Sequence, residues 1–196
     1  MSKLYFRYGV MGSSKTAEAL MCRFNYIQKG FNVLLLKPSI DNRFEEDNPQ
    51  VISRIGIKAD CIKFDKNQDL IKLFNTENSK YRIDVIIVDE CQFCSAIQIE
   101  QLRRIAYDVN VLCYGLLTNF KTELFEGSKR LIEIADSLQE VKSVCKCGRK
   151  ASVNARLVNG QITTSGAEVM IGAEECYESM CYLCFRKKLS QQQKNE

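Results

Sequence analysis

Residues 9–16 read GVMGSSKT, and this stretch decides the fold. Residues Leu4–Tyr8 before it predict a short strand, and residues 15–29 after it carry apolar side chains at helical spacing. A glycine-containing loop between a strand and a helix, ending in Lys-Thr, is the arrangement in which backbone N–H groups surround a phosphate chain. We therefore expect a Walker A loop, in which Lys15 binds the β- and γ-oxygens of a nucleotide and Thr16 offers its hydroxyl to Mg²⁺.

One position of this loop departs from the usual pattern. Ser14 stands before the lysine, where the pattern has glycine. A small residue fits there if its backbone stays in a helical region, whereas a larger side chain would crowd the phosphate. The alternative interpretation is a serine-rich helix start that binds no phosphate.

A second motif lies 73 residues further along the chain. Residues 83–88 read IDVIIV and predict a buried strand that ends at Asp89 and Glu90. Ligands of open α/β sheets bind at the edge where such strands end. We expect Asp89 to hold Mg²⁺ and Glu90 to act as a general base towards an attacking hydroxyl. The alternative is that both acids merely begin a loop.

Strands and helices alternate over roughly the first 140 residues, which predicts a parallel sheet with helices on its faces. After Val144 the pattern changes to cysteine pairs and Asn-Gly or Ser-Gly turns, which predict short hairpins with little core. We place domains at 1–143 and 144–188 and a flexible tail at 189–196. The other expected strands are 33–36, 61–64, 111–115 and 141–144, the other helices are 68–74, 95–107 and 128–135, and residues 38–56 are expected as a loop.

Composition narrows the function. The chain has 196 residues, a net charge of +4, ten cysteines and no histidine, so Ser-His and Cys-His catalysis are excluded. The charge is too small to indicate nucleic-acid binding by itself. We see neither a membrane span nor a signal peptide, and we expect a reducing, cytoplasmic location.

Four of the cysteines form two close pairs. Cys145 and Cys147 precede Cys181 and Cys184, and paired cysteines separated by a hairpin-like stretch are typical of structural Zn²⁺ sites. The first pair has a one-residue spacer, which is shorter than usual. The alternative is four free thiols. We expect the remaining six cysteines to be packing residues.

Several further segments, in order along the chain, resemble the zinc-containing, type II thymidine kinases. Asp89-Glu90-Cys91-Gln92-Phe93 resembles the family's acid pair followed by Gln-Phe. Residues 37–56, the Gly-Leu segment at 115–120 and the Ile-Gly segment at 171–172 with Tyr177 also match. The resemblance implies an α/β fold with a P-loop (RecA-like) parallel sheet, helices on both faces, and a small zinc-knuckle and lasso domain. It implies transfer of phosphate from ATP to thymidine, with deoxyuridine as a further acceptor.

The resemblance also implies roles for individual residues. Glu90 would be catalytic, with Arg43 orienting charge. The residues expected to serve ATP and Mg²⁺ are Gly9, Met11, Gly12, Ser13, Ser14, Lys15, Thr16, Asp89 and Gln92. The residues expected around the nucleoside are Asp41, Phe93, Leu116, Phe120, Met170, Ile171, Gly172 and Tyr177, with a lasso at about 151–177 whose feet are held by zinc.

The resemblance further implies a homotetramer and feedback inhibition by dTTP. Two other hypotheses stay open at this point. One is a kinase-like protein that binds nucleotides with little turnover, motivated by Ser14 and by Ala173 in place of a second glycine. The other is a RecA-like ATPase acting on nucleic acid, against which the modest charge and the lack of a basic stripe count.

Overall fold

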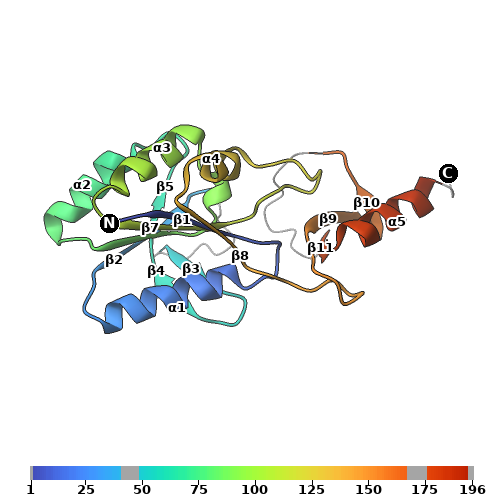
Figure 1. Ribbon diagram of the computed structural model, residues 1–196, viewed down its shortest axis with the longest axis horizontal. Helices are drawn as coiled ribbons and strands as arrows, with labels where there is room; N and C mark the ends of the chain where they lie inside the picture. Colours follow the sequence, from blue (N-terminus) through green and yellow to red (C-terminus); the bar gives the residue numbers. More distant parts are fainter. Residues whose placement is uncertain (1, 41–48, 167–175, 194–196) are drawn as a thin grey trace.

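The computed structural model describes residues 2–40, 49–166 and 176–193, with a six-stranded parallel sheet at its centre (Figure 1). The strand order is β5-β2-β6-β7-β1-β8, and every neighbouring pair is parallel. The strands are β1 (Leu4–Tyr8), β2 (Val33–Pro38), β5 (Ile62–Phe64), β6 (Val85–Val88), β7 (Asn110–Gly115) and β8 (Ser137–Glu140). The predicted α/β class is confirmed.

Helices cover both faces of this sheet, as predicted. On one face, α1 (Lys15–Gln28) lies beside a hairpin of β3 (Gln50–Ile52) and β4 (Lys58–Asp60). On the other face lie α2 (Leu70–Lys80), α3 (Ala96–Ile105) and α4 (Glu126–Ile134), with the short 3₁₀ helix η1 (Cys91–Phe93) near α4. All four residues of β6 are buried because the sheet is covered on both sides, which explains their unbroken apolar character.

Side-chain caps set the starts of two of these helices. The Ser95 hydroxyl accepts from the backbone N–H of Gln98, and the Gln98 side chain accepts from the Ser95 N–H, which forms a capping box. The Asp69 carboxylate accepts from the N–H groups of Ile71 and Lys72 at the start of α2. The predicted cap at Ser95 is therefore confirmed.

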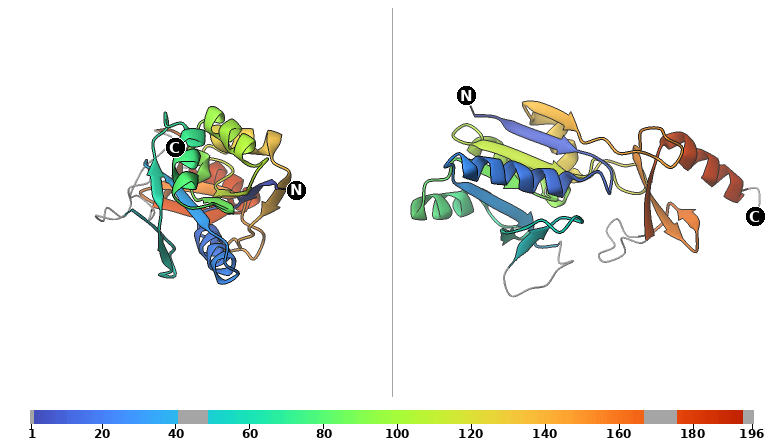
Figure 2. Two further views of the ribbon diagram at one scale, coloured as in Figure 1. Left: turned by 90° about the vertical axis from the view of Figure 1, so that its left-hand side faces the viewer. Right: turned by 90° about the horizontal axis from the view of Figure 1, so that it is seen from below.

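A second, smaller unit lies at the end of the sheet where β1, β6 and β7 finish (Figures 1 and 2). It contains β9 (Val153–Val158), β10 (Gln161–Thr163), β11 (Tyr177–Met180) and α5 (Tyr182–Gln193). The turn at Asn159 and Gly160 has positive φ at both residues, 51° and 78°, which matches a two-residue hairpin. This unit has a small core of its own, in which Val153, Ala155, Ile162, Met180 and Phe185 pack together.

The structure corrects some sequence predictions. Residues 38–56 are not all loop, because β3 lies within them and pairs with β4. The last strand of the main sheet is β8 at Ser137–Glu140 instead of 141–144. It is a partly exposed edge strand, so its sequence is too polar to be recognised as a sheet strand.

The tail predicted at 189–196 overlaps a helix. Helix α5 continues through residues 189–193, and the Gln192 side chain accepts from the N–H of Ile162 at 3.1 Å. This contact ties the end of the helix to β10. Among the residues that the structure describes, no helix combines the length and apolar character that crossing a membrane requires.

Candidate active site

The loop at 9–16 lies between β1 and α1, as predicted, and its first glycine is required sterically. A Cβ added to Gly9 would lie 2.4 Å from the carbonyl oxygen of Val141 and 2.6 Å from Ser13 Oγ. Since real Cβ atoms do not approach other atoms that closely, only glycine fits between Val141, just after β8, and Ser13 of the same loop. The Gly9 N–H also donates to the carbonyl of Gly115, at the end of β7.

Ser14 adopts a left-handed conformation, with φ 64° and ψ 19°. A side chain in that region meets its own backbone, which costs roughly 1–2 kcal/mol relative to glycine. Serine therefore replaces glycine here at the cost of backbone strain. The helical region that we expected for Ser14 is the left-handed one. Gly12 has a positive φ as well, 72°.

Lys15 is buried and points back over the loop. Its Nζ donates to the carbonyl oxygen of Val10 at 2.8 Å and to Ser13 Oγ at 3.3 Å. Burial lowers the pKa of Lys15, and the nearby carboxylates of Glu90 and Asp89 act in the opposite direction. The structure thus brings the lysine and the acid pair into one electrostatic cluster.

Thr16 and Asp89 are in direct contact. Thr16 Oγ1 lies 3.1 Å from Asp89 Oδ2, which joins the first turn of α1 to the end of β6. A hydroxyl and a carboxylate are hard oxygen ligands of the kind that Mg²⁺ takes. The residues predicted for the metal therefore fit the ion.

Gln92 orients Glu90. Gln92 Nε2 donates to Glu90 Oε2 at 2.5 Å, and Gln92 Oε1 accepts from the N–H of Leu116 at 3.0 Å. A Cβ on Gly115 would lie 2.5 Å from Gln92 Oε1, so glycine is needed there to admit the amide. The structure therefore places Gln92, expected as a nucleotide contact, between the acid and the loop after β7.

Three aromatic residues that the resemblance assigns to the nucleoside site have defined neighbours in the structure. Phe93 packs edge-on against Phe125, with ring centroids 5.9 Å apart. Phe120 is buried beneath the guanidinium of Arg156, whose central carbon lies 3.6 Å from the ring centroid. Arg156 Nε donates to the hydroxyl of Tyr177 at 2.7 Å. Phe120 and Tyr177, distant in sequence, are thus brought together by a residue that the sequence analysis did not name.

Five of the predicted site residues lie outside the described residues. They are Asp41, Arg43, Met170, Ile171 and Gly172.

Three residues near the site had no role assigned from the sequence: Arg54, which lies in one of the segments that carry the resemblance, and Asn154 and Arg156, which lie in no motif. A Cβ on Gly12 would lie 3.8 Å from Arg54 Nη1, so the turn between β3 and β4 carries a cation to the phosphate loop. Asn154 and Arg156 are buried polar residues of β9. The sequence carries one signal for Asn154 and Arg156: they alternate with the apolar residues Val153, Ala155 and Leu157. Such alternation indicates a strand with one apolar face and one polar face.

The four predicted zinc ligands form one cluster. The Sγ atoms of Cys145, Cys147, Cys181 and Cys184 all lie within 4.8 Å of one another, and those of Cys147 and Cys181 are 3.6 Å apart. Thiolates bound to zinc at about 2.3 Å in a tetrahedron lie about 3.8 Å apart, so the cluster is compatible with zinc.

The short spacer and the electrostatics also suit a cation. The chain turns tightly after Cys145, where the N–H of Gly148 donates to the Cys145 carbonyl at 2.8 Å. Backbone N–H groups, chiefly that of Cys147, lower the pKa of the Cys145 thiol to about 6. The pKa of Cys184 is raised to about 12 because its thiol donates to Cys147 and Cys181. The Cys145 thiol is therefore predisposed to lose its proton, which binding to a zinc ion requires.

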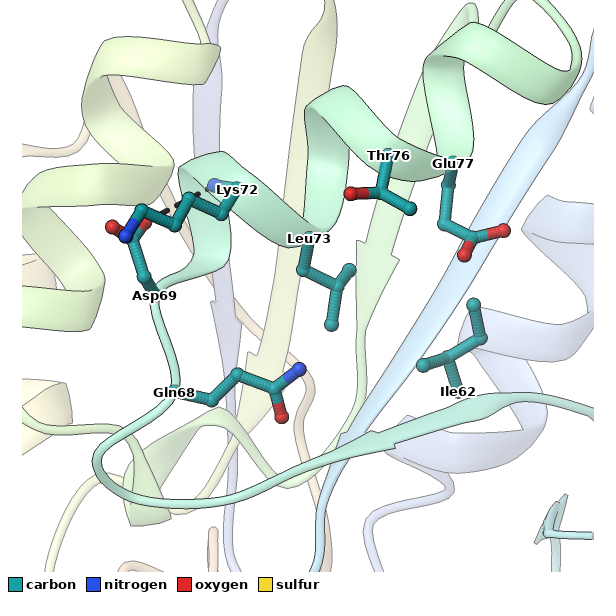
Figure 3. A pocket seen from close by; sticks show the side chains of 7 residues that line it. All are labelled: Ile62, Gln68, Asp69, Lys72, Leu73, Thr76 and Glu77. Atoms are coloured by element: carbon teal, nitrogen blue, oxygen red, sulfur yellow. Dashed lines mark hydrogen bonds between the residues drawn. The ribbon is translucent and has the colours of Figure 1, made fainter.

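A pocket of about 360 Å³ lies elsewhere, beside α2 (Figure 3). Its lining residues are Ile62, Gln68, Asp69, Lys72, Leu73, Thr76 and Glu77. It contains none of the residues that surround the phosphate loop, so we place the active site at the loop and not in this pocket.

Comparison with known proteins gives the family. The thymidine kinase family model matches residues 2–185. A thymidine kinase of Shewanella oneidensis is 41% identical over 190 residues, covering 95% of this chain and 98% of that protein. Thymidine kinases of Rhodopirellula baltica and phage T4 are 39% and 41% identical, covering 100% and 92% of this chain and 93% and 94% of those proteins. The match includes the strained phosphate loop, the acid pair and the cysteine cluster, and the chain belongs to the thymidine kinase family.

Proposed function

We propose that this protein transfers the γ-phosphate of ATP to the 5′-hydroxyl of thymidine, with deoxyuridine as a second acceptor. The observation that carries the proposal is the contact of Thr16 with Asp89, because it unites the phosphate loop and the acid pair at one edge of the sheet. The family match and the names of the similar proteins support the choice of thymidine.

Glu90 is the proposed general base. Gln92 donates to its Oε2 at 2.5 Å, which fixes the orientation of the carboxylate that would accept a proton from the 5′-hydroxyl. Positioning of this kind supplies much of phosphoryl-transfer catalysis, since the reaction needs alignment and charge stabilisation more than covalent help.

The remaining roles are assigned by position. Lys15 and the N–H groups of residues 9–16 would bind the ATP phosphates, and Thr16 and Asp89 would hold Mg²⁺, which neutralises phosphate charge when bound. Phe93, Leu116, Phe120 and Tyr177 would surround the nucleoside. For Asp41, Arg43, Met170, Ile171 and Gly172 we keep the roles expected from the resemblance.

The test is a kinase assay with Mg-ATP and thymidine. We expect dTMP from the wild type and a rate lowered roughly 10²–10⁴-fold in Glu90→Gln, with ATP affinity little changed. Glu133→Gln, which removes an acid from an exposed pair with Arg130, is the matched control and should keep full activity. Wild-type protein that forms no dTMP, indistinguishable from Glu90→Gln, would refute the proposal.

We also propose a structural zinc ion at the four cysteines. The ion would clamp residues 145–147 to the start of α5 and so hold the base of the smaller unit. A closed set of four thiolates leaves no open coordination position, so the metal would take no part in the chemistry.

The remaining proposals concern assembly, regulation and location. Helix α1 exposes Met21 and Phe24 by 50% and 59%, and such apolar exposure suits the proposed homotetramer. Light scattering should show a tetramer, and the Phe24→Glu variant should have a lower mass. A wild-type monomer would rule out the tetramer.

We propose feedback inhibition by dTTP, to be checked by competition with thymidine. All ten cysteines, each within the described residues, are free thiols, which suits the proposed cytoplasmic location; fractionation would test it.

A further inference from the structure

Strand β9 is buried on both faces, and its two faces differ in character. Val153 and Ala155 pack in the small core of the second unit with Ile162 and Phe185. Since successive side chains of a strand point to opposite faces, Asn154 and Arg156 belong to the other face. Both are 3% exposed, so these polar groups are held in the interior by specific partners.

The Asn154 side chain bridges two loops of the larger unit. Its Oδ1 accepts from the backbone N–H of Met11 at 2.7 Å, and its Nδ2 donates to the carbonyl oxygen of Thr118 at 3.2 Å. Met11 lies in the phosphate loop. Thr118 lies between Leu116 and Phe120, which are assigned to the nucleoside site.

The same strand also reaches the nucleoside site directly. Arg156 stacks on Phe120 and donates to the Tyr177 hydroxyl. Val10 of the phosphate loop completes the contact from the other side, because it packs in the small core with Val153 and Ala155. A shift of β9 would therefore displace the phosphate loop and the nucleoside walls together.

We propose that Asn154 is a positioning residue that couples the binding of ATP to the binding of the nucleoside. The inference rests on the proposed function, since it assigns phosphate to the loop at 9–16 and nucleoside to the site around Phe120. A nucleotide that orders the phosphate loop would fix the position of the Met11 N–H and, through its hydrogen bond, that of the Asn154 side chain. Asn154 would in turn fix the position of β9 and of the loop that contains Thr118. By linkage, thymidine would then raise the affinity for ATP by the same factor.

Titration calorimetry can measure this coupling. Thymidine binding is measured alone and with a saturating, non-hydrolysable ATP analogue and Mg²⁺. For the wild type we expect the analogue to tighten thymidine binding at least about fivefold, within the usual range for coupled sites. For Asn154→Ala we expect the two dissociation constants to agree within about twofold.

Two further variants serve as controls, one for the loss of side-chain volume at position 154 and one for changes elsewhere in the same hairpin. Asn154→Asp keeps an acceptor for the Met11 N–H but places a carboxylate oxygen against the Thr118 carbonyl, so it should also lose coupling while changing little in size. Asn159→Gly, in the exposed turn of the same hairpin, should keep the wild-type ratio. Melting temperatures of all variants show whether the fold is retained.

The outcomes separate this inference from the proposed function. The role of Asn154 would be overturned if both Asn154→Ala and Asn154→Asp kept the wild-type ratio of thymidine dissociation constants without and with the analogue. It would also be overturned if the wild type showed no coupling. Either result would leave the kinase assignment intact. A folded wild type that binds neither thymidine nor the analogue would overturn both.

Discussion

Thr16 Oγ1 and Asp89 Oδ2 lie 3.1 Å apart, although 73 residues separate them in the chain. Thr16 belongs to the first turn of α1 and Asp89 follows β6. The parallel sheet places the ends of β1 and β6 at the same edge, and this contact is the result. A hydroxyl already paired with a carboxylate is preorganised to share a cation with it.

We predict that Asp89→Asn raises the Mg²⁺ concentration needed for half-maximal activity roughly 10–100-fold, because one carboxylate charge is lost where the ion is expected. Magnesium titration of the initial rate measures this. Thr16→Ser keeps the hydroxyl and should titrate like the wild type. An unchanged magnesium requirement in Asp89→Asn would place the ion elsewhere.

We predict that Ser14→Gly stabilises the protein by about 0.5–1 kcal/mol. The removed left-handed strain, about 1–2 kcal/mol, is partly offset by the greater freedom of glycine in the unfolded chain. Urea denaturation measures the difference. Ser14→Ala retains the Cβ and should bring no such gain, and equal stability of the alanine and glycine variants would contradict the explanation.

We predict that ATP binding takes up protons in the alkaline range. Burial lowers the pKa of Lys15 in the free protein below the ordinary 10.5. The free fold therefore gains stability as pH rises from the lowered pKa towards 10.5, because the unfolded chain then binds more protons than the fold. Bound phosphates favour the ammonium form and raise the pKa again, so ATP affinity should fall with rising pH.

Calorimetry in alkaline buffers of different ionisation enthalpy measures this proton uptake. Lys15→Arg keeps a permanent charge and should lose the uptake. If Lys15→Arg takes up as many protons as the wild type, another group titrates.

We predict that Cys184→Ser lowers the zinc content of the purified protein from about one ion per chain towards zero and lowers the melting temperature by at least about 5 °C. Metal analysis and thermal unfolding measure the two effects. Cys176→Ser, outside the cluster, should retain the metal. Wild-type protein purified without zinc, or unchanged by chelation, would contradict the proposal.

Local signals made much of the fold predictable. The strand, loop and helix around Lys15 carry their own turn residues and periodicity, and Ser95 carries its own cap. Strand β8 escaped recognition because an edge strand such as Ser137–Glu140 needs little apolar character. The hairpin of β3 and β4 was missed for a different reason: each of its strands has only three residues, too few to show a repeating pattern.

The candidate site divides in the same way. Thr16, Asp89 and Glu90 were recognised because their motifs are contiguous and parallel strands end at a shared edge. Gln92 was recognised as a site residue, yet its contact with Glu90 and Leu116 depends on the close approach that Gly115 permits. Asn154 and Arg156 carry no motif, because their partners lie in other parts of the chain.

The sequence by itself determined the α/β class, the phosphate loop, the acid pair and the four cysteines, because each is encoded by residues that are close in the chain or repeat with a regular period. Only the tertiary structure decided that Ser14 is left-handed, that the four thiols converge, and that β9 joins the phosphate loop to Phe120. Those features depend on distances between remote segments, which packing sets and local patterns do not encode.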